Sequence, residues 1–178
     1  GGFRTSYGDF LLTLQNYRAL TYGQMVVSAV DALQHDEGIR TAVLGPLQHI
    51  IVDEYQDTNR AQEQLVMELA AEGAHVCVVG DDDQAIYQWR GATVENILEF
   101  RVRFANGGEV AVAELPANHR SQPPIVAVAQ DFIESNVGER LKKSMTPYRQ
   151  IQGGLVCSWT AEIAADEAEI IAQTMLRL

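Results

Sequence analysis

The stretch that decides the fold is HIIVDEYQDTN, residues 49–59, in which a short apolar run ends in two adjacent carboxylates. Residues 49–52 are rich in β-branched side chains and too few for a helix, which favours a strand buried on both faces. Asp53 and Glu54 follow directly, and Asp57 comes shortly after. Because ligands of open α/β sheets bind beyond the carboxyl ends of the strands, this stretch predicts functional residues at a sheet edge.

Strand-like and helix-like segments alternate along the rest of the chain. Apolar residues at helical spacing predict helices over 24–33, 59–73, 121–133 and 161–176. Asn59 and Gln62 form a candidate capping box, and Pro123 and Pro124 suit the first turn of the third helix. Further strands are predicted at 75–79, 109–115 and 155–160, with a polar linker at 141–154. The alternation indicates an α/β fold with a mostly parallel sheet flanked by helices.

Composition and charge narrow the class of protein. The chain has 178 residues, 47% of them hydrophobic, and a formal net charge of -11, so it is not expected to bind nucleic acid through charge alone. Cys77 and Cys157 lie far apart in apolar runs, which predicts buried thiols without a disulfide. No apolar run approaches the ~20 residues of a membrane span, and the start lacks a signal pattern. We therefore expect a cytoplasmic protein.

A second acidic segment follows the strand predicted at 75–79. Residues 78–83 read VVGDDD, so three aspartates would lie beside Asp53 and Glu54 at the same sheet edge. Because carboxylates this close repel one another, we expect a cation among them, and Mg²⁺ prefers oxygen ligands. Helix capping is the alternative for single acids such as Asp57 and Asp82.

Three ordered motifs carry a family resemblance. They are VDEYQDTN at 52–59, VVGDDDQAIYQWRGA at 78–92 and LPANHRS at 115–121. Together they resemble the UvrD/Rep/PcrA-like DNA helicases of superfamily 1, most closely from residue 49 to residue 149. The resemblance implies a partial RecA-like P-loop NTPase domain that uses ATP and Mg²⁺.

The resemblance implies roles for the residues that surround ATP. Asp53 would bind Mg²⁺, and Glu54 would be a second metal-site carboxylate and the general base for the attacking water. Gln84 would contact the γ-phosphate, with a surface glutamine as the alternative. Arg120 would be an arginine finger. His119 stands where the family usually has a tyrosine near adenine, and a plain surface histidine is the alternative.

The segment IYQWRGA, residues 86–92, supplies candidate DNA contacts. Tyr87 and Trp89 would lie on one side of an extended segment, with Arg90 beside them. Aromatic rings stack on bases of any sequence, which suits movement along single-stranded DNA. Packing in the core is the alternative for a tryptophan. Stacking would also allow local DNA binding by an acidic chain.

One expected motif is missing from this sequence. A phosphate-binding loop needs Gly-x-x-x-x-Gly-Lys-Ser/Thr, yet the lysines of the chain are Lys142 and Lys143, and neither follows glycine. We expect the motif before Gly1 and the chain to be an internal piece of a larger helicase. The expected parts are residues 1–47 from an inserted helical subdomain, 48–150 from the first RecA-like domain, and 151–178 from the second.

The resemblance implies an enzyme that couples ATP hydrolysis to movement on single-stranded DNA and to unwinding of duplex junctions, 3′ to 5′, in repair or replication. The piece itself is expected to be inactive, because it lacks the phosphate loop. Two alternatives stay open: the motor part of an exonuclease V-like helicase-nuclease, and a non-catalytic DNA-binding or scaffold homologue.

Overall fold

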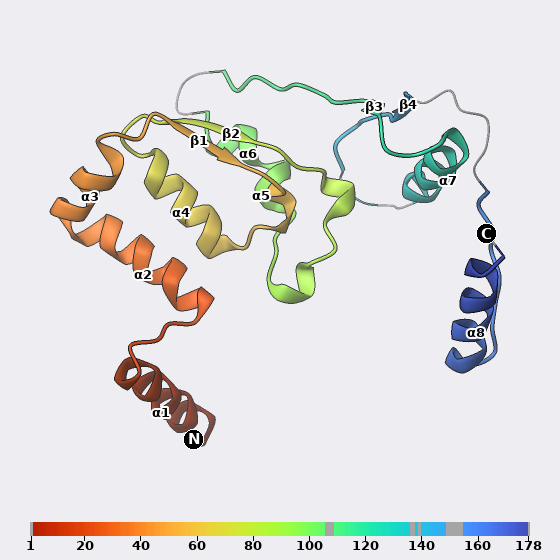
Figure 1. Ribbon diagram of the computed structural model, residues 1–178. Coiled ribbons are helices and arrows are strands. Elements are labelled where there is room, and N and C mark those ends of the chain that lie inside the picture. The colour runs from red at the N-terminus through yellow and green to blue at the C-terminus, as the bar shows by residue number, and fades with distance from the viewer. Residues whose placement is uncertain (1, 106–108, 136–137, 139, 149–154, 178) are drawn as a thin grey trace. The chain divides into compact units, whose positions relative to one another are not determined.

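The computed structural model describes residues 2–105, 109–135, 138, 140–148 and 155–177, and the chain forms two compact units, 1–111 and 112–178. Each unit contains helices and a two-stranded parallel sheet (Figure 1). The parallel pairing and the flanking helices confirm the predicted α/β class.

The sheet of the first unit joins β1 (His49–Val52) to β2 (His75–Val78) in parallel. Helix α4 (Arg60–Ala70) connects the two strands and contacts β1 (Figure 1). Along each strand exposed residues alternate with half-buried ones, and Ile51 is 76% exposed. The prediction of strands buried on both faces is therefore wrong for these residues, because α4 covers the face opposite to Ile51.

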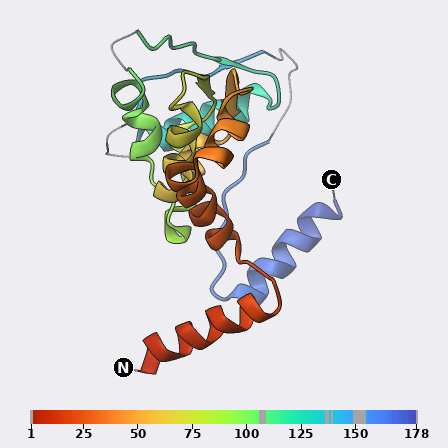
Figure 2. The same ribbon diagram turned by 90° about the vertical axis from the view of Figure 1, so that its left-hand side faces the viewer.

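Three helices precede the sheet: α1 (Gly2–Asn16), α2 (Tyr22–His35) and α3 (Glu37–Leu44). Helix α2 matches the prediction and packs against α3 and α4. Helix α2 ends at His35, and the next residue, Asp36, caps a new helix by accepting the Ile39 N–H at 3.0 Å. Helix α1 lies beyond the start of α2 (Figure 2). Neither α1 nor α3 was predicted.

The capping box predicted for α4 is confirmed. The Gln62 backbone N–H donates to the Asn59 side-chain oxygen at 3.0 Å, and the Asn59 backbone N–H donates to the Gln62 side-chain oxygen at 2.9 Å. The predicted stop at Gly73 also holds, since this glycine has a φ of 92°. The two signals therefore mark the start of α4 and the turn that follows its end.

Short elements follow the two strands. They are the 3₁₀ turns η1 (Tyr55–Asp57), η2 (Asp82–Gln84) and η3 (Gln88–Arg90), and the helices α5 (Glu95–Leu98) and α6 (Phe100–Arg103). Tyr55, fully buried, meets Phe100 edge to face with ring centroids 5.6 Å apart. This contact packs the turn after β1 against α6.

The second unit contains β3 (Ala117–Asn118), α7 (Pro123–Glu134), β4 (Thr146–Pro147) and α8 (Ala164–Met175). Helix α7 begins with its two prolines as predicted. The apolar face of α7 is mostly uncovered in the described residues: Val126 is buried, whereas Phe132 is 76% exposed.

Several other predictions for the second half of the chain are wrong. Residues 109–115 and 155–160 are not strands, because an extended segment becomes a strand only when a neighbour pairs with it, and the described residues supply none. Cys77 and Cys157 are free but exposed, so their predicted burial is also wrong. Within the predicted linker, residues 149–154 lie outside the described residues.

Among the described residues, none of the helices combines the length and the apolar character that crossing a membrane requires.

Candidate functional site

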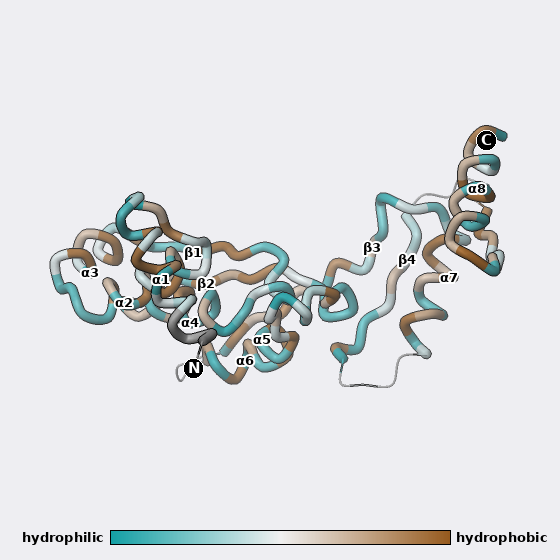
Figure 3. Tube along the Cα trace, turned by 90° about the horizontal axis from the view of Figure 1, so that it is seen from below, coloured by the Kyte–Doolittle hydropathy of each residue, from teal (hydrophilic) through white to brown (hydrophobic). Residues whose placement is uncertain are grey.

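The carboxyl ends of β1 and β2 carry the predicted site residues side by side. Beyond the strands the pairing continues, since the Val79 N–H donates to the Val52 carbonyl at 2.8 Å and the Tyr55 N–H donates to the Val79 carbonyl at 3.0 Å. Figure 3 shows both strands as hydrophobic tube that becomes hydrophilic where the acidic residues begin. Residues 53–57 and 80–84 therefore leave one sheet edge together.

Glu54 adopts an uncommon backbone conformation. Its φ of 51° and ψ of 44° are left-handed, which costs a residue other than glycine about 1–2 kcal/mol. The Asp53 carboxylate accepts the Glu54 backbone N–H at 2.9 Å and supports this turn. Both acidic residues are exposed, so their carboxylates are accessible to a ligand.

The side chain of Gln56 connects the two loops. Gln56 is buried, with only 1% of its surface exposed. Nε2 of Gln56 donates to Oε2 of Glu54 at 2.7 Å, and Oε1 of Gln56 accepts the Asp81 backbone N–H at 3.0 Å. Gly80 makes room for this side chain, because a Cβ at position 80 would lie 2.5 Å from Oε1 of Gln56.

The acidic cluster after β2 consists of Asp81, Asp82 and Asp83, whose carboxylates offer oxygen atoms within 4.8 Å of one another. Asp81 accepts the Asp83 backbone N–H at 3.1 Å and the Gln84 side-chain N–H at 2.7 Å. In the part of the chain that the structure describes, no group of three or more possible ligands includes Asp53 or Glu54. The predicted metal role of those two residues stays a prediction.

A buried polar network lies behind the site. Asn96, fully buried, donates from Nδ2 to the Thr58 carbonyl at 3.2 Å and to Oγ1 of Thr58 at 3.1 Å. Arg103 donates to Oδ1 of Asn96 at 3.2 Å and forms ion pairs with Glu63 and Glu99. The network ties the turn after β1 to α4, α5 and α6.

The network also changes two pKa values. Burial, together with the nearby Glu63 carboxylate, raises the pKa of Tyr55 to about 12. The hydrogen bonds that Arg103 donates to Glu99 and, next in effect, to Glu63 raise the pKa of Arg103 above its ordinary value. Tyr55 therefore stays neutral and Arg103 stays charged throughout the physiological range.

The candidate DNA contacts form an exposed cluster in the first unit. The ring centroids of Tyr87 and Trp89 lie 6.4 Å apart, and the guanidinium carbon of Arg90 lies 5.6 Å and 5.7 Å from them. Trp89 is 80% exposed, which rules out core packing for its ring. The expected extended segment is wrong, because the residues form the 3₁₀ turn η3, yet the two rings are adjacent as predicted.

The third motif lies in the second unit. Oδ1 of Asn118 accepts the backbone N–H groups of Arg120 and Ser121 at 3.0 Å and 2.8 Å. The Arg120 side chain is exposed. His119 packs against Tyr148, with ring centroids 4.1 Å apart, so an aromatic partner already occupies one side of the imidazole.

Comparison with known proteins places this chain in a family. The profile of the UvrD/REP helicase N-terminal domain matches residues 2–105. The chain belongs to the UvrD/REP helicase family.

Named relatives support that assignment. The chain is 34% identical to ATP-dependent DNA helicase UvrD1 of Mycobacterium leprae over 94% of its own length and 22% of the relative. It is 36% identical to ATP-dependent DNA helicase PcrA of Bacillus subtilis over 79% of its length and 18% of the relative. The chain thus spans about a fifth of the length of the curated relatives it matches.

The three motifs pointed to exposed candidate residues but not to the residues that contact them. Gln56, Gly80, Asn96 and Arg103 were not predicted as site residues. For Gln56 and Gly80 a signal exists within the motifs themselves: Gln56 lies between Glu54 and Asp57, and Gly80 directly precedes Asp81. Asn96 carries no local signal, since its partner Thr58 lies 38 residues away. Arg103 has a local partner in Glu99, four residues earlier, but its buried partner Glu63 lies 40 residues away.

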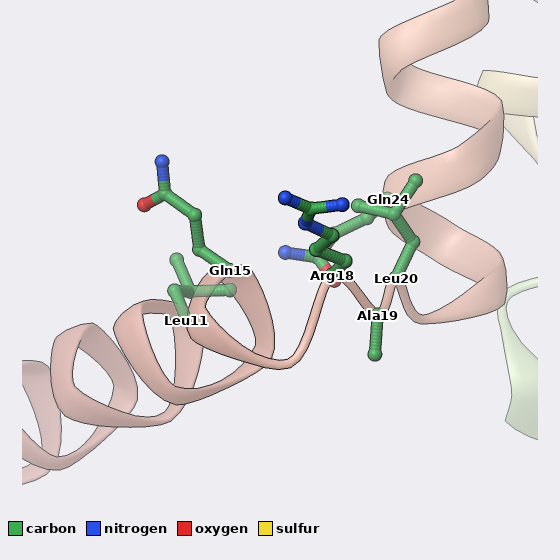
Figure 4. Close-up of a pocket in the computed structure, with 6 residues that line it drawn as sticks. All are labelled: Leu11, Gln15, Arg18, Ala19, Leu20 and Gln24. Atoms are coloured by element: carbon green, nitrogen blue, oxygen red, sulfur yellow. The ribbon is translucent and has the colours of Figure 1, made fainter.

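A cavity lies apart from the UvrD/REP motifs, where α1 meets α2 (Figure 4). Its volume is about 460 Å³, and its lining consists of Leu11, Gln15, Arg18, Ala19, Leu20 and Gln24. None of these residues belongs to the predicted site. Three of the six lining residues are apolar, and the one charged side chain among them belongs to Arg18, whose φ is 50°.

Proposed function

We propose that this chain is part of an ATP-dependent DNA helicase that couples hydrolysis of Mg-ATP to movement along single-stranded DNA and to duplex unwinding. The movement is 3′ to 5′, and the protein acts on duplex junctions in the cytoplasm during repair or replication. One observation carries the proposal: Glu54 and the loop that bears Gln84 leave paired strands side by side, and a buried glutamine joins them. The names of the relatives, ATP-dependent DNA helicases, support it.

The residues at the sheet edge suit a divalent cation and a hydrolytic water. Carboxylate oxygens are the ligands that Mg²⁺ prefers, and Asp53 offers an exposed one directly after β1. Asp53 would hold the cation and Glu54 would accept the proton of the attacking water. Bound Mg²⁺ supplies positive charge for the phosphate oxygens. Gln84 would exchange its bond with Asp81 for one to the γ-phosphate.

The other predicted residues complete the proposal. Arg120 would neutralise charge on the leaving phosphate, and His119 would lie near adenine. Tyr87 and Trp89 would stack on bases, with Arg90 contributing its charge. The exposure of Trp89 supports this role.

We propose the same division of the longer protein as the motifs predict. Residues 1–47 belong to an inserted helical subdomain, 48–150 to the first RecA-like domain and 151–178 to the second. The phosphate-binding lysine would come from elsewhere in that protein, because Lys142 and Lys143 do not follow glycine. The chain alone would therefore not sustain ATP hydrolysis.

A strand-displacement assay tests the proposal on the longer protein that contains this chain. Duplexes with a 3′ or a 5′ single-stranded tail are incubated with ATP and Mg²⁺. The proposal expects unwinding of the 3′-tailed duplex and little of the 5′-tailed one. Unwinding from the 5′ tail alone would overturn the polarity. Binding of both duplexes without any unwinding would support a scaffold protein instead.

A further inference from the structure

Gln56 makes the contacts expected of a residue that sets the spacing between two catalytic loops. Both atoms of its side-chain amide are used, and each reaches a different loop: Nε2 contacts Glu54 after β1, and Oε1 contacts the Asp81 backbone after β2. The residue is only 1% exposed, so water does not replace these bonds easily. We propose that Gln56 is a positioning residue that fixes the Glu54 carboxylate relative to residues 81–84.

The backbone around Gln56 is shaped for this contact. Glu54 takes a left-handed conformation, which turns the backbone sharply after β1. In this turn the side chain of Gln56 reaches the Glu54 carboxylate. On the other loop, Gly80 provides the space that Oε1 of Gln56 occupies, since a Cβ there would also lie 2.8 Å from Cδ1 of Ile97. A left-handed residue on the first loop and a position without a side chain on the second therefore both serve Gln56.

Asp81 extends the effect of Gln56 to the second loop. The same residue whose N–H Gln56 holds also accepts the side-chain amide of Gln84 at 2.7 Å. Gln56 is thus linked to both residues: it donates a hydrogen bond directly to Glu54, and it is connected to Gln84 through Asp81. The inference rests on the proposed function insofar as Glu54 and Gln84 act on ATP, while the bracing contact itself does not depend on it.

The first test measures the brace in the 178-residue chain, without nucleotide. In Gln56→Met the side chain keeps its approximate volume but loses both polar contacts. We expect exchange of the Asp81 amide hydrogen, followed by NMR, to speed up about five- to tenfold, the factor that corresponds to one lost hydrogen bond.

Gln64→Met is the matched control for this test. Gln64 also donates from Nε2 to a glutamate carboxylate at 2.7 Å, but its partner is Glu68 on the same helix. The control should leave Asp81 exchange unchanged. If Gln56→Met does not fold, Asp81 exchange is measured in Gln56→Asn instead, because the shorter asparagine side chain cannot reach both loops. Unchanged Asp81 exchange in the folded variant would overturn the brace.

Gly80→Ala tests the fit of Gln56 from the opposite loop. Its added Cβ meets Oε1 of Gln56, so Asp81 exchange should rise in the wild-type background. In a Gln56→Met background the Asp81 N–H has already lost its acceptor, so the same change should add less exchange, and the remainder would come from Cδ1 of Ile97, 2.8 Å from the same Cβ. Equal increases in both backgrounds would show that the glycine serves something other than Gln56.

The second test measures DNA-stimulated ATP hydrolysis in the longer protein. With Gln56→Met we expect kcat to fall about tenfold or more while KM for ATP stays within about threefold, because positioning affects the chemical step more than binding. Gln64→Met should match the wild type. Equal kcat for the wild type and Gln56→Met would overturn the positioning role. Absence of hydrolysis by the wild type would instead contradict the proposed function and leave the exchange result to decide the brace.

Discussion

Residues 53–57 and residues 87–90 lie in the same unit, yet their side chains are held in opposite ways. The Glu54 carboxylate accepts a hydrogen bond from Gln56, whose side-chain amide is buried and makes two hydrogen bonds. Trp89 is 80% exposed, and within the described residues its ring contacts are with its sequence neighbours Tyr87 and Arg90. The difference fits the two roles proposed above: a general base needs one fixed position, whereas rings that stack on passing bases need an accessible face.

Replacing Glu54 tests the fixed region with the largest expected effect. In the longer protein, Glu54→Gln should lower DNA-stimulated ATP hydrolysis about 10²- to 10⁴-fold, because the glutamine cannot accept the proton of water. Steady-state hydrolysis measures the effect, and single-stranded DNA affinity is the control that should stay the same. A variant with more than half of the wild-type rate would remove Glu54 from the catalytic role.

Breaking the network behind the fixed region should destabilise the first unit. Arg103→Met leaves Glu63, 5% exposed, without its cation, and we expect a loss of about 2–3 kcal/mol in the free energy of unfolding. Urea denaturation measures it.

Arg101→Met is the matched control for Arg103→Met, since Arg101 is exposed on the same short helix α6. The control should change the stability by less than about 0.5 kcal/mol. Equal losses in the two variants would mean that the ion pair does not hold the turn after β1.

Removing the exposed ring tests the second region. Trp89→Ala should weaken binding of a labelled oligo-dT to the 178-residue chain by about 1–3 kcal/mol, the loss of one stacked base. Fluorescence anisotropy of the label measures it. Trp159→Ala, which removes a half-exposed tryptophan outside the motifs, should bind like the wild type. Equal losses would attribute the binding to general tryptophan content and not to η3.

Alkaline pH should loosen the fixed region by a smaller amount. The folded state keeps the Tyr55 proton up to a pKa of about 12, whereas the unfolded chain releases it near pH 10. This contribution to stability is therefore complete below pH 10 and is lost as the pH rises from 10 to 12, by at most about 1.4 kcal/mol per pH unit. Urea denaturation at pH 9 and pH 11 measures it.

Tyr55→Phe is the control for the alkaline titration, because it keeps the ring and removes the ionising group. Its stability should fall less between pH 9 and pH 11 than that of the wild type. An identical decline would assign the alkaline loss to other groups.

The parts of the fold that follow from local chemistry could be predicted from the sequence. The Asn59–Gln62 capping box sets the start of α4, and the prolines at 123 and 124 set the start of α7. The segments 109–115 and 155–160 have strand-like composition, but strand formation depends on a partner that composition does not reveal. Helix α3 was missed because Asp36 ends one helix and caps the next.

The candidate site divides in the same manner. Motif resemblance located the exposed residues that would touch ligands, such as Glu54 and Trp89. It did not locate Asn96 or Arg103, because their contacts with Thr58 and Glu63 form only when segments about 40 residues apart pack together. Gln56 stands between these cases: it lies inside a motif, but its contact with the Asp81 backbone becomes visible only once β1 and β2 pair.

The most direct measurement of the central claim is steady-state ATP hydrolysis by the longer protein, with and without single-stranded DNA, and with Mg²⁺ or with excess EDTA. The isolated 178-residue chain serves as the reference, and we expect no turnover from it. The account predicts hydrolysis that rises when single-stranded DNA is added and disappears when Mg²⁺ is removed. A rate that is the same with and without DNA, or steady DNA-dependent turnover by the isolated chain, would contradict it.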